Sequence, residues 1–134
     1  MRRRTIAVIS VLSAGLAAAA VLFVPVLWLQ LDETAVPPVS DLPALPAGVT
    51  IASDEVMCGS GGCWHQLTLS GPENQSAEEL VAGVGDALGL PVSTSGQPQE
   101  ACHARGLLDR RRVCTGAGVM RNEVSVYLLY ERFV

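Results

Sequence analysis

The sequence predicts an α+β protein: a single N-terminal transmembrane helix is followed by a small extracytoplasmic antiparallel sheet with one packed helix, stapled by disulfides. Three observations predict it. Residues 6–31 form an uncharged, apolar run. The rest of the chain combines short β-type segments with one amphipathic helical segment, which is typical of a sheet covered on one face by a helix. Its four cysteines form an even set in a short domain, as in exported proteins.

The chain divides into four parts: a basic cytoplasmic head at residues 1–5, a membrane-spanning helix at 6–31, a proline-rich linker at 32–48 and an extracytoplasmic domain at 49–134. All 13 acidic residues follow the apolar run, together with six arginines, which leaves a formal charge of −7 on that part. We expect no nucleic-acid partner, because an acidic surface repels phosphates. The absence of lysine is typical of a high-GC bacterial genome.

The apolar run is long enough to cross a bilayer. Its 26 residues would extend about 39 Å as a helix, against a hydrocarbon core of about 30 Å. Pro25 is expected to kink the helix, and Trp28 lies where an interfacial aromatic anchor is expected. Arginines precede the run and acidic residues follow it, so we expect a cytoplasmic N-terminus and an extracytoplasmic C-terminal domain. The predicted location is the cell membrane, with lipid as the partner of residues 6–31.

A cleaved secretory signal is the alternative interpretation of this run. A basic head, an apolar stretch and small residues occur in both kinds of segment. The alanines at 17–20 offer cleavage sites. Cleavage there would leave residues 21–31 as an exposed apolar N-terminus, which favours the uncleaved anchor. Both interpretations export the domain.

Residues 32–48 contain four prolines, which exclude a regular helix and favour an extended, semi-rigid spacer. The alternative is an irregular segment that packs onto the domain through Leu42, Leu45 and Val49.

Residues 49–58 and 63–70 predict a β-hairpin. The first segment is rich in β-branched residues, and the second alternates, with Leu67 and Leu69 on one side. The intervening GSGG supplies glycines for the reversal.

Residues 76–91, SAEELVAGVGDALGLP, predict the helix of the domain. Ser76 and Glu79 have the spacing of a capping box, Gly89 is placed as the C-terminal cap and Pro91 as a stop. The apolar face consists of Leu80, Val81, Val84 and Leu88. Two internal glycines cost about 1 kcal/mol each, so the helix depends on packing against a sheet.

The remaining segments complete the predicted sheet. Residues 92–100 predict a polar loop. Residues 101–117 fit a second hairpin that turns near Leu108 to Arg110, or else a short helix from Ala101 to Arg112. Residues 123–134 predict a strand. The residues on one face of this strand are Val124, Val126, Leu128 and Tyr130.

The cysteines are expected to form structural disulfides rather than a reactive site. They are Cys58, Cys63, Cys102 and Cys114. Local pairing contributes about 2 and 3 kcal/mol, and crossed or nested pairing about 4 kcal/mol for each bond, so chain entropy alone does not choose. We favour Cys58 with Cys63 and Cys102 with Cys114, because cysteines that flank a turn face each other across a hairpin. Redox catalysis is disfavoured because no C-x-x-C sequence begins a helix.

Metal binding is the rival use of these sulfurs. Cys63 lies near His65 and Cys102 beside His103, so each pair offers a sulfur and a nitrogen ligand for zinc or copper. The spacing matches no zinc finger or ribbon, and thiolate ligands compete with oxidation outside the cytoplasm. We therefore expect no metal and no other cofactor.

A hydrolase with an unrecognised site is the third hypothesis. Asp54, Glu55 and His65 are expected near one another in the first hairpin, but the sequence around Ser60 is not a nucleophile elbow. A concave pocket around His65 would support this hypothesis.

Two features are candidate partner contacts. The basic residues of the domain gather at Arg105, Arg110, Arg111 and Arg112, where they either engage phosphate-bearing envelope polymers and lipid headgroups or form a solvated turn. Trp64 is either a partner contact or a lid over the adjacent disulfide. Without a catalytic constellation, the leading hypothesis is a non-enzymatic, membrane-anchored interaction domain or accessory subunit that contacts another membrane or envelope protein.

Overall fold

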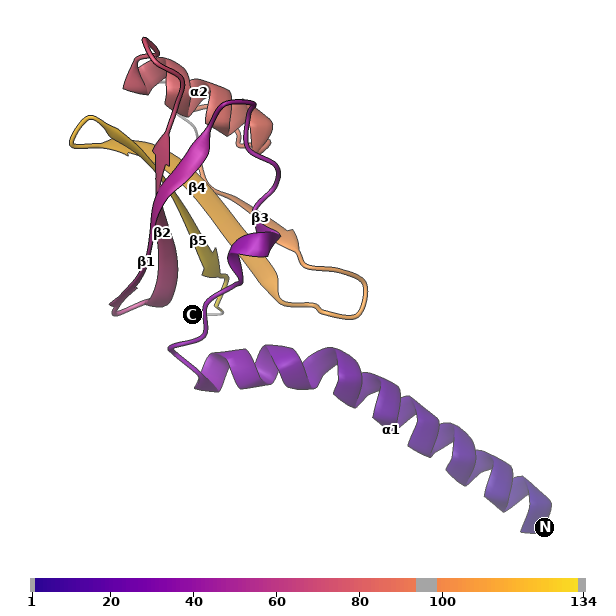
Figure 1. The fold of residues 1–134 in the computed structure, drawn as a ribbon. Helices are drawn as coiled ribbons and strands as arrows, with labels where there is room; N and C mark the ends of the chain where they lie inside the picture. The colour runs from indigo at the N-terminus through magenta and orange to yellow at the C-terminus, as the bar shows by residue number, and fades with distance from the viewer. Residues whose placement is uncertain (1, 94–98, 133–134) are drawn as a thin grey trace.

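The computed structural model describes residues 2–93 and 99–132. Figure 1 shows one long helix that projects from a body formed by a sheet and a second helix. The elements in chain order are α1 (Arg2–Leu31), the 3-10 helix η1 (Val39–Asp41), β1 (Thr50–Gly59), β2 (Gly62–Ser70), α2 (Ala77–Ala87), β3 (Ala101–Ala104), β4 (Arg112–Met120) and β5 (Glu123–Tyr130). The predicted α+β body is confirmed. Part of the predicted polar loop, residues 94–98, lies outside the described residues.

All five strands form one antiparallel sheet in the order β1-β2-β5-β4-β3. The first hairpin is confirmed, and the segment from 101 to 114 forms the second hairpin rather than the short helix. Strand β5 lies between β2 and β4 and pairs with both. The last strand in the sequence is therefore the centre of the sheet, and it joins the two hairpins.

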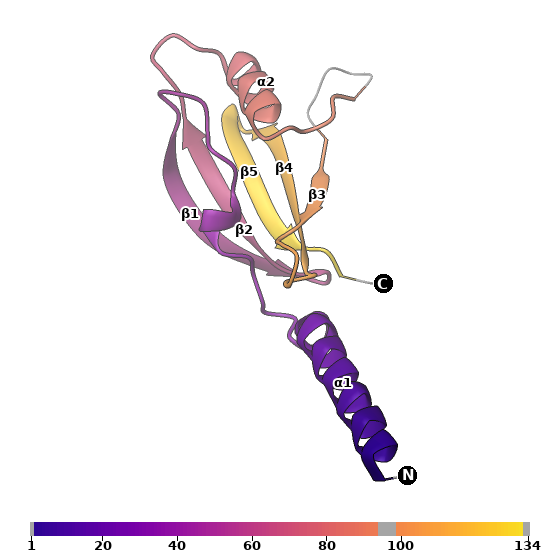
Figure 2. The same ribbon diagram turned by 90° about the vertical axis from the view of Figure 1, so that its right-hand side faces the viewer.

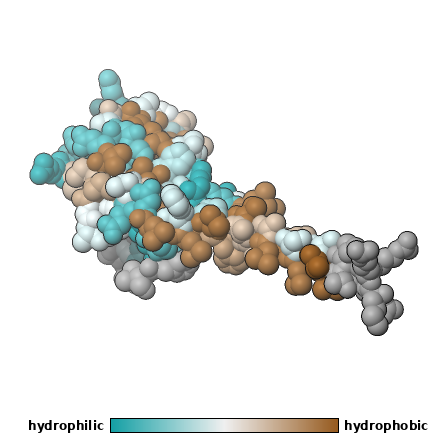
Figure 3. Space-filling view, turned by 90° about the horizontal axis from the view of Figure 1, so that it is seen from below, coloured by the Kyte–Doolittle hydropathy of each residue, from teal (hydrophilic) through white to brown (hydrophobic). Residues whose placement is uncertain are grey.

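The helix α1 contains an apolar span from Val8 to Leu31 with a mean hydropathy of 2.3. The span is long and apolar enough to cross a membrane, and a signal sequence near an N-terminus has the same length and composition. Pro25 lies inside the helix and does not end it. Figure 3 shows hydrophobic surface along α1, whereas much of the surface of the domain is hydrophilic.

The hydrophobic core lies on one face of the sheet. Its most buried members are Leu67, Val84, Val113, Val124, Val126 and Leu128. The helix α2 packs on β4 and β5 through the predicted apolar face. All four residues predicted for one face of the last strand are buried, which confirms the alternation.

Residues 32–48 do not form the expected free spacer, because they lie against the core. Pro37 is fully buried, and Val39, Leu42 and Leu45 pack on the core cluster. The reason is geometric: α2 has 11 residues and covers about 16 Å, whereas strands of eight to ten residues extend about 27–34 Å. The apolar residues between the prolines cover part of the face that α2 does not reach.

The ends of α2 have the predicted caps. The Ser76 hydroxyl accepts a hydrogen bond from the Glu79 backbone nitrogen at 3.2 Å, and the Glu79 carboxylate accepts one from the Ser76 nitrogen at 3.2 Å. At the other end Gly89 has φ +64°, and the Leu90 nitrogen donates to the Gly85 carbonyl at 2.9 Å. This last bond is the long one of a Schellman motif, which ends the helix.

Two tight turns complete the sheet. The turn between β1 and β2 consists of Ser60 and Gly61, and the following Gly62 has φ +109°. Between β4 and β5 the turn consists of Arg121 and Asn122, whose φ values are +52° and +68°. Two positive φ values are characteristic of a type I′ turn, which matches the twist of the strands. The sequence did not predict this third hairpin.

The domain has two distinct ends (Figures 1 and 2). The β1–β2 turn and the β3–β4 loop lie at the end next to α1, and α2 and the β4–β5 turn lie at the opposite end. The Arg132 guanidinium donates to the backbone carbonyls of Leu29 at 2.6 Å and Asp32 at 2.7 Å. The Leu29 side chain is only 3% exposed. The domain is therefore seated directly on the end of α1.

Candidate functional site

The sheet has a second face, opposite the one that α2 and residues 35–49 cover. We call it the open face. One row of side chains crosses all five strands on this face, in the order Met57, Trp64, Leu129, Cys114 and Cys102. Met57 is 44% exposed, and Trp64 and Leu129 are partly exposed. The alternation that buries one face of β5 thus places apolar and aromatic residues on the other.

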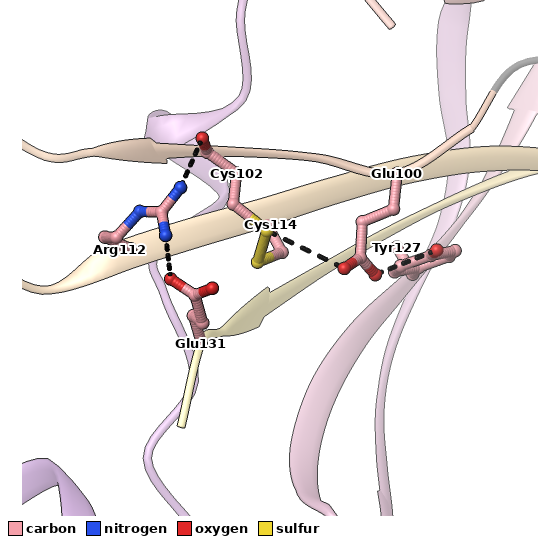
Figure 4. The surroundings of a disulfide bond; sticks show 6 residues. All are labelled: Glu100, Cys102, Arg112, Cys114, Tyr127 and Glu131. Carbon is pink, nitrogen blue, oxygen red and sulfur yellow. Dashed lines mark hydrogen bonds and ion pairs between the residues drawn. A yellow bond between two sulfur atoms is a disulfide. The ribbon is translucent and has the colours of Figure 1, made fainter. Parts of the chain in front are cut away.

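A second row on the open face is formed by Gln66, Tyr127 and Gly116. The Tyr127 ring lies on Gly116 so closely that a Cβ at this glycine would overlap the ring. Figure 4 shows the Tyr127 hydroxyl pointing to Glu100, and it donates to the carboxylate at 3.1 Å. The other Glu100 oxygen lies 3.6 Å from the sulfur of Cys102. The glycine therefore allows the ring to lie flat and to hold the carboxylate beside the disulfide.

Burial raises the pKa of Tyr127 to about 12, and the negative charge of Glu100 adds to the effect. The ionised phenolate would lie next to a carboxylate, so the neutral form is favoured. The hydroxyl therefore remains a hydrogen-bond donor throughout the physiological pH range.

An open cavity of about 340 Å³ lies on this face and is lined by Trp64, Glu100, Tyr127 and Leu129. The indole nitrogen of Trp64 donates to the Gln66 side-chain oxygen at 3.3 Å, which fixes the orientation of the ring. Aromatic walls with a carboxylate at the edge suit an apolar side chain or a cationic group.

The position of Trp64 bears on one of its two predicted roles, the lid over the disulfide. Cys63 is buried on the core face, and the adjacent Trp64 points to the open face, because successive residues of a strand point to opposite faces. Its ring lies near Gly59 of the neighbouring strand. This placement on the face opposite Cys63 disfavours the lid, and the partner contact stays a prediction.

The disulfides have the predicted local pairing. Cys58 is bonded to Cys63, and Cys102 to Cys114, with Cα atoms 4.1 and 4.0 Å apart. Among the described residues, no cysteine is free. Glu100 lies close to the second disulfide, but its sulfurs are bonded to each other and are not available as thiolate ligands.

The histidines of the alternative metal site lie apart. His65 is on β2 and His103 on β3, with β5 and β4 between them. His65 instead forms a hydrogen-bonded pair with Asp54, with Nδ1 and Oδ1 2.6 Å apart. His65 does not line the cavity on the open face, the cavity beside α2 or the groove beside α1. The pair has the geometry of an oriented imidazole, and among the described residues the imidazole forms no hydrogen bond to a hydroxyl group.

Two of the four predicted partner arginines form an internal network. Arg105 pairs with Asp41 at 2.6 Å and with Asp109 at 3.0 Å, and Arg111 pairs with Asp109 at 2.6 Å. Arg111 also lies over the ring of Tyr130, 5.1 Å from its centre. Hydrogen bonds from Arg111 lower the pKa of Asp109 to about 2. The network ties the segment that contains η1 to the β3–β4 loop.

The other two predicted arginines differ from each other. Arg112 pairs with Glu131 at 2.6 Å and donates to the Cys102 carbonyl at 3.2 Å (Figure 4). Arg110 is exposed and forms no ion pair with any residue that the structure describes. The basic cluster of the sequence is thus divided, because three of its members form ion pairs within the domain and Arg110 forms none with the described residues.

The sequence reasoning missed four residues of the open face: Met57, Glu100, Tyr127 and Leu129. The alternation in residues 123–130 contains a signal for the last two, because they occupy the phase opposite the buried one. Their proximity to Trp64 depends on the pairing of β2 with β5, for which the sequence carries no local signal. Comparison with models of known protein families, with curated proteins and with solved structures finds no match to this chain.

Proposed function

We propose that this chain is a single-pass protein of the bacterial cell membrane whose extracytoplasmic domain binds a partner protein through the open face, without catalysing a reaction. The observation that carries the proposal is the row from Met57 through Trp64 to Leu129. Its apolar and aromatic side chains lie on the face opposite the covered core. Aromatic residues in a partly buried setting are typical of the centre of protein interfaces.

The anchor and its orientation have separate support. The span from Val8 to Leu31 has the length of a transmembrane helix, and arginines precede it in the sequence. Both disulfides belong to the part that follows the span, and such bonds persist in oxidising compartments outside the cytoplasm. These observations favour a domain on the outer side of the membrane.

The chemistry of the open face suggests the chemistry of the partner. Glu55 lies next to Met57 on the same face of β1 and is paired with Gln66 of β2. Glu100 borders the cavity beside Trp64. The whole part of the chain after residue 31 carries a formal charge of −7. A partner that inserts an apolar side chain flanked by arginine or lysine complements this surface in shape and charge.

Site-specific photo-crosslinking in intact membranes tests the proposal. A crosslinking amino acid at Met57 is expected to give one discrete adduct. The matched control is Met120, which is 60% exposed and shares the open face but lies away from the Met57 row, at the β4–β5 turn on the opposite end of the domain from α1. The substitution Trp64→Ala is expected to lower the adduct yield from Met57 by about tenfold, as for a residue at the centre of an interface.

Three results would count against this function. Equal adducts from Met57 and Met120 indicate random collision. An adduct that is insensitive to Trp64→Ala places the contact elsewhere. Full function of a secreted domain without residues 1–31 removes the anchor from the proposal.

A further inference from the structure

The loop between β3 and β4, residues 105–111, displays two adjacent leucines. Leu107 is 91% exposed and Leu108 is 71% exposed. For comparison, Leu31 at the end of the apolar helix is 80% exposed. Exposed pairs of large aliphatic residues at a loop tip are unfavourable in water and need a specific explanation.

The base of this loop is held in place. The Arg105 nitrogen donates to the Arg111 carbonyl at 3.1 Å, and the Asp109 carboxylate accepts from the Arg111 nitrogen at 3.1 Å. The ion pairs of Asp109 with both arginines close the loop further. These hydrogen bonds and ion pairs hold the loop, and therefore its two leucines, in one position relative to the sheet.

The loop lies beside the apolar helix. Figures 1 and 2 both place it at the end of the domain that adjoins α1. Arg110 and α1 together line a groove of about 520 Å³. The helix residues that line this groove are Leu22, Phe23, Val26, Leu27 and Gln30.

The depth of this groove follows from the length of the span. Its 24 residues extend about 36 Å, and the hydrocarbon core of a bilayer is about 30 Å thick. A centred span therefore leaves the hydrocarbon within its last few residues, close to Gln30. The groove therefore begins at the boundary between headgroups and acyl chains near Gln30 and extends about 12 Å along α1 into the acyl region, as far as Leu22.

One accessible polar donor of the groove is unpaired. Arg110 is exposed and forms no ion pair with any of the described residues. The side-chain nitrogen of Gln30 also has no hydrogen-bond partner among them, but it is buried and out of direct reach of a ligand. A ligand that fits has an anionic group for the guanidinium and apolar chains for the apolar lining residues, which is the chemistry of a phospholipid.

We propose that the β3–β4 loop is a second membrane contact: Leu107 and Leu108 enter the outer leaflet, while Arg110 donates to a lipid phosphate. The proposal rests on the proposed function only in requiring that α1 spans the bilayer. Together with the bonds from Arg132 to the end of α1, this contact fixes the tilt of the domain and directs the open face sideways along the membrane.

Tryptophan quenching in vesicles tests the contact on the full chain. The vesicles contain phosphatidylcholine brominated on its acyl chains, mixed with phosphatidylglycerol. Three single-tryptophan proteins are compared. The first keeps Trp28 and carries Trp64→Phe, the second carries Trp28→Phe, Trp64→Phe and Leu108→Trp, and the third has Met120→Trp in place of Leu108→Trp.

The expected result is strong quenching of Trp28 and of the tryptophan at 108, and at least threefold weaker quenching at 120. Adding Arg110→Glu to the second protein is expected to reduce quenching at 108 by about half, because the phosphate contact is lost. Leu108, Met120 and Arg110 are exposed, so the substitutions at these positions leave the core intact.

The outcomes separate the two proposals. If Trp28 is quenched and position 108 is quenched no more than position 120, the anchor stands and the loop contact is overturned. The same holds if positions 108 and 120 are quenched equally strongly, because the domain then adheres without orientation. If Trp28 itself is not quenched, the anchor fails and the loop contact fails with it. A loop that binds a protein instead of lipid gives no quenching at 108 in these protein-free vesicles.

Discussion

At the scale of single residues, contacts between near neighbours in the sequence were predictable, and contacts between distant residues were not. Ser76, Glu79 and Gly89 were predictable because a cap depends on neighbours a few residues apart. The pairing of Cys58 with Cys63 was predictable for the same reason. The ion pair between Asp41 and Arg105 was not, since 64 positions separate them and only the completed fold brings them together. A cluster of arginines in the sequence therefore did not reveal which of them are bound internally.

Gly116 is expected to be the least replaceable glycine of the sheet. Gly116→Ala places a Cβ inside the Tyr127 ring and is expected to lower the free energy of unfolding by about 1–3 kcal/mol, the usual cost of overpacking. Denaturant unfolding followed by tryptophan fluorescence measures the change. Gly118→Ala is the matched control, because no atom lies within 4 Å of its Cβ position.

The Tyr127→Ala background tests the cause of this loss. Without the ring, Gly116→Ala is expected to be neutral or stabilising, since alanine restricts the unfolded chain more than glycine does. An equal loss in both backgrounds would show that the ring is not responsible.

Asp109 is expected to make the domain sensitive to acid. Its pKa is lowered by Arg111 from 3.8 to about 2 in the folded state, so its ionised form stabilises the fold above pH 4. This contribution is lost as the pH falls from about 4 to 2. After allowance for its partial exposure, it is on the order of 1 kcal/mol.

The substitution Asp109→Asn tests this contribution. The variant is expected to lose this part of the stability at pH 7 and to show a smaller decrease between pH 4 and pH 2 than the parent. Denaturant midpoints at a series of pH values measure it. Parallel curves for parent and variant would contradict the assignment.

Elements with a local period were predictable, and elements joined by an unusual turn were not. The helix α2 and the buried phase of β5 follow directly from apolar spacing. The hairpin of β4 and β5 escaped prediction because its turn contains Arg121 and Asn122 rather than glycine, although both have positive φ. The position of β5 between the two other hairpins depends on long-range pairing, which periodicity does not encode.

The glycines of α2 are expected to respond in opposite directions to the same change. Gly83 is exposed in the helix interior, with no atom within 4 Å of its Cβ position, so Gly83→Ala is expected to stabilise the domain by about 1 kcal/mol. Gly89 has equally open space but φ +64°, so Gly89→Ala is expected to destabilise it by about 1 kcal/mol. Thermal unfolding of the two variants measures the difference. A change of the same sign in both would contradict the backbone argument.

At the scale of the whole molecule, the packed segment before β1 and the seating of the domain on α1 change the predicted architecture. Prolines in residues 32–48 favoured a spacer, but the face of the sheet that α2 leaves uncovered requires apolar partners, and Pro37 is one of them. The sequence shows the composition of this segment but not the area that remains uncovered. Arg132 then holds the end of α1, across 103 positions of sequence.

The two disulfides are expected to contribute unequally to stability. Their cysteines are 5 and 12 positions apart, so the chain-entropy estimate gives about 2 kcal/mol for the first bond and about 3 kcal/mol for the second. Replacing each pair by serine and measuring denaturant midpoints under non-reducing conditions tests this order. Unchanged midpoints in both variants would contradict a stabilising role.

The sheet ends on each side in a strand that is covalently tied to its neighbour. β1, whose ten residues are all exposed, is bonded to β2, and the short β3 is bonded to β4. An exposed edge strand permits copies of a protein to exchange strands or to aggregate into fibres. An edge strand that is disulfide-bonded to its neighbour cannot detach and exchange with another copy. Crowded copies of the protein are therefore expected not to exchange these strands, and reduction of the disulfides would remove this protection.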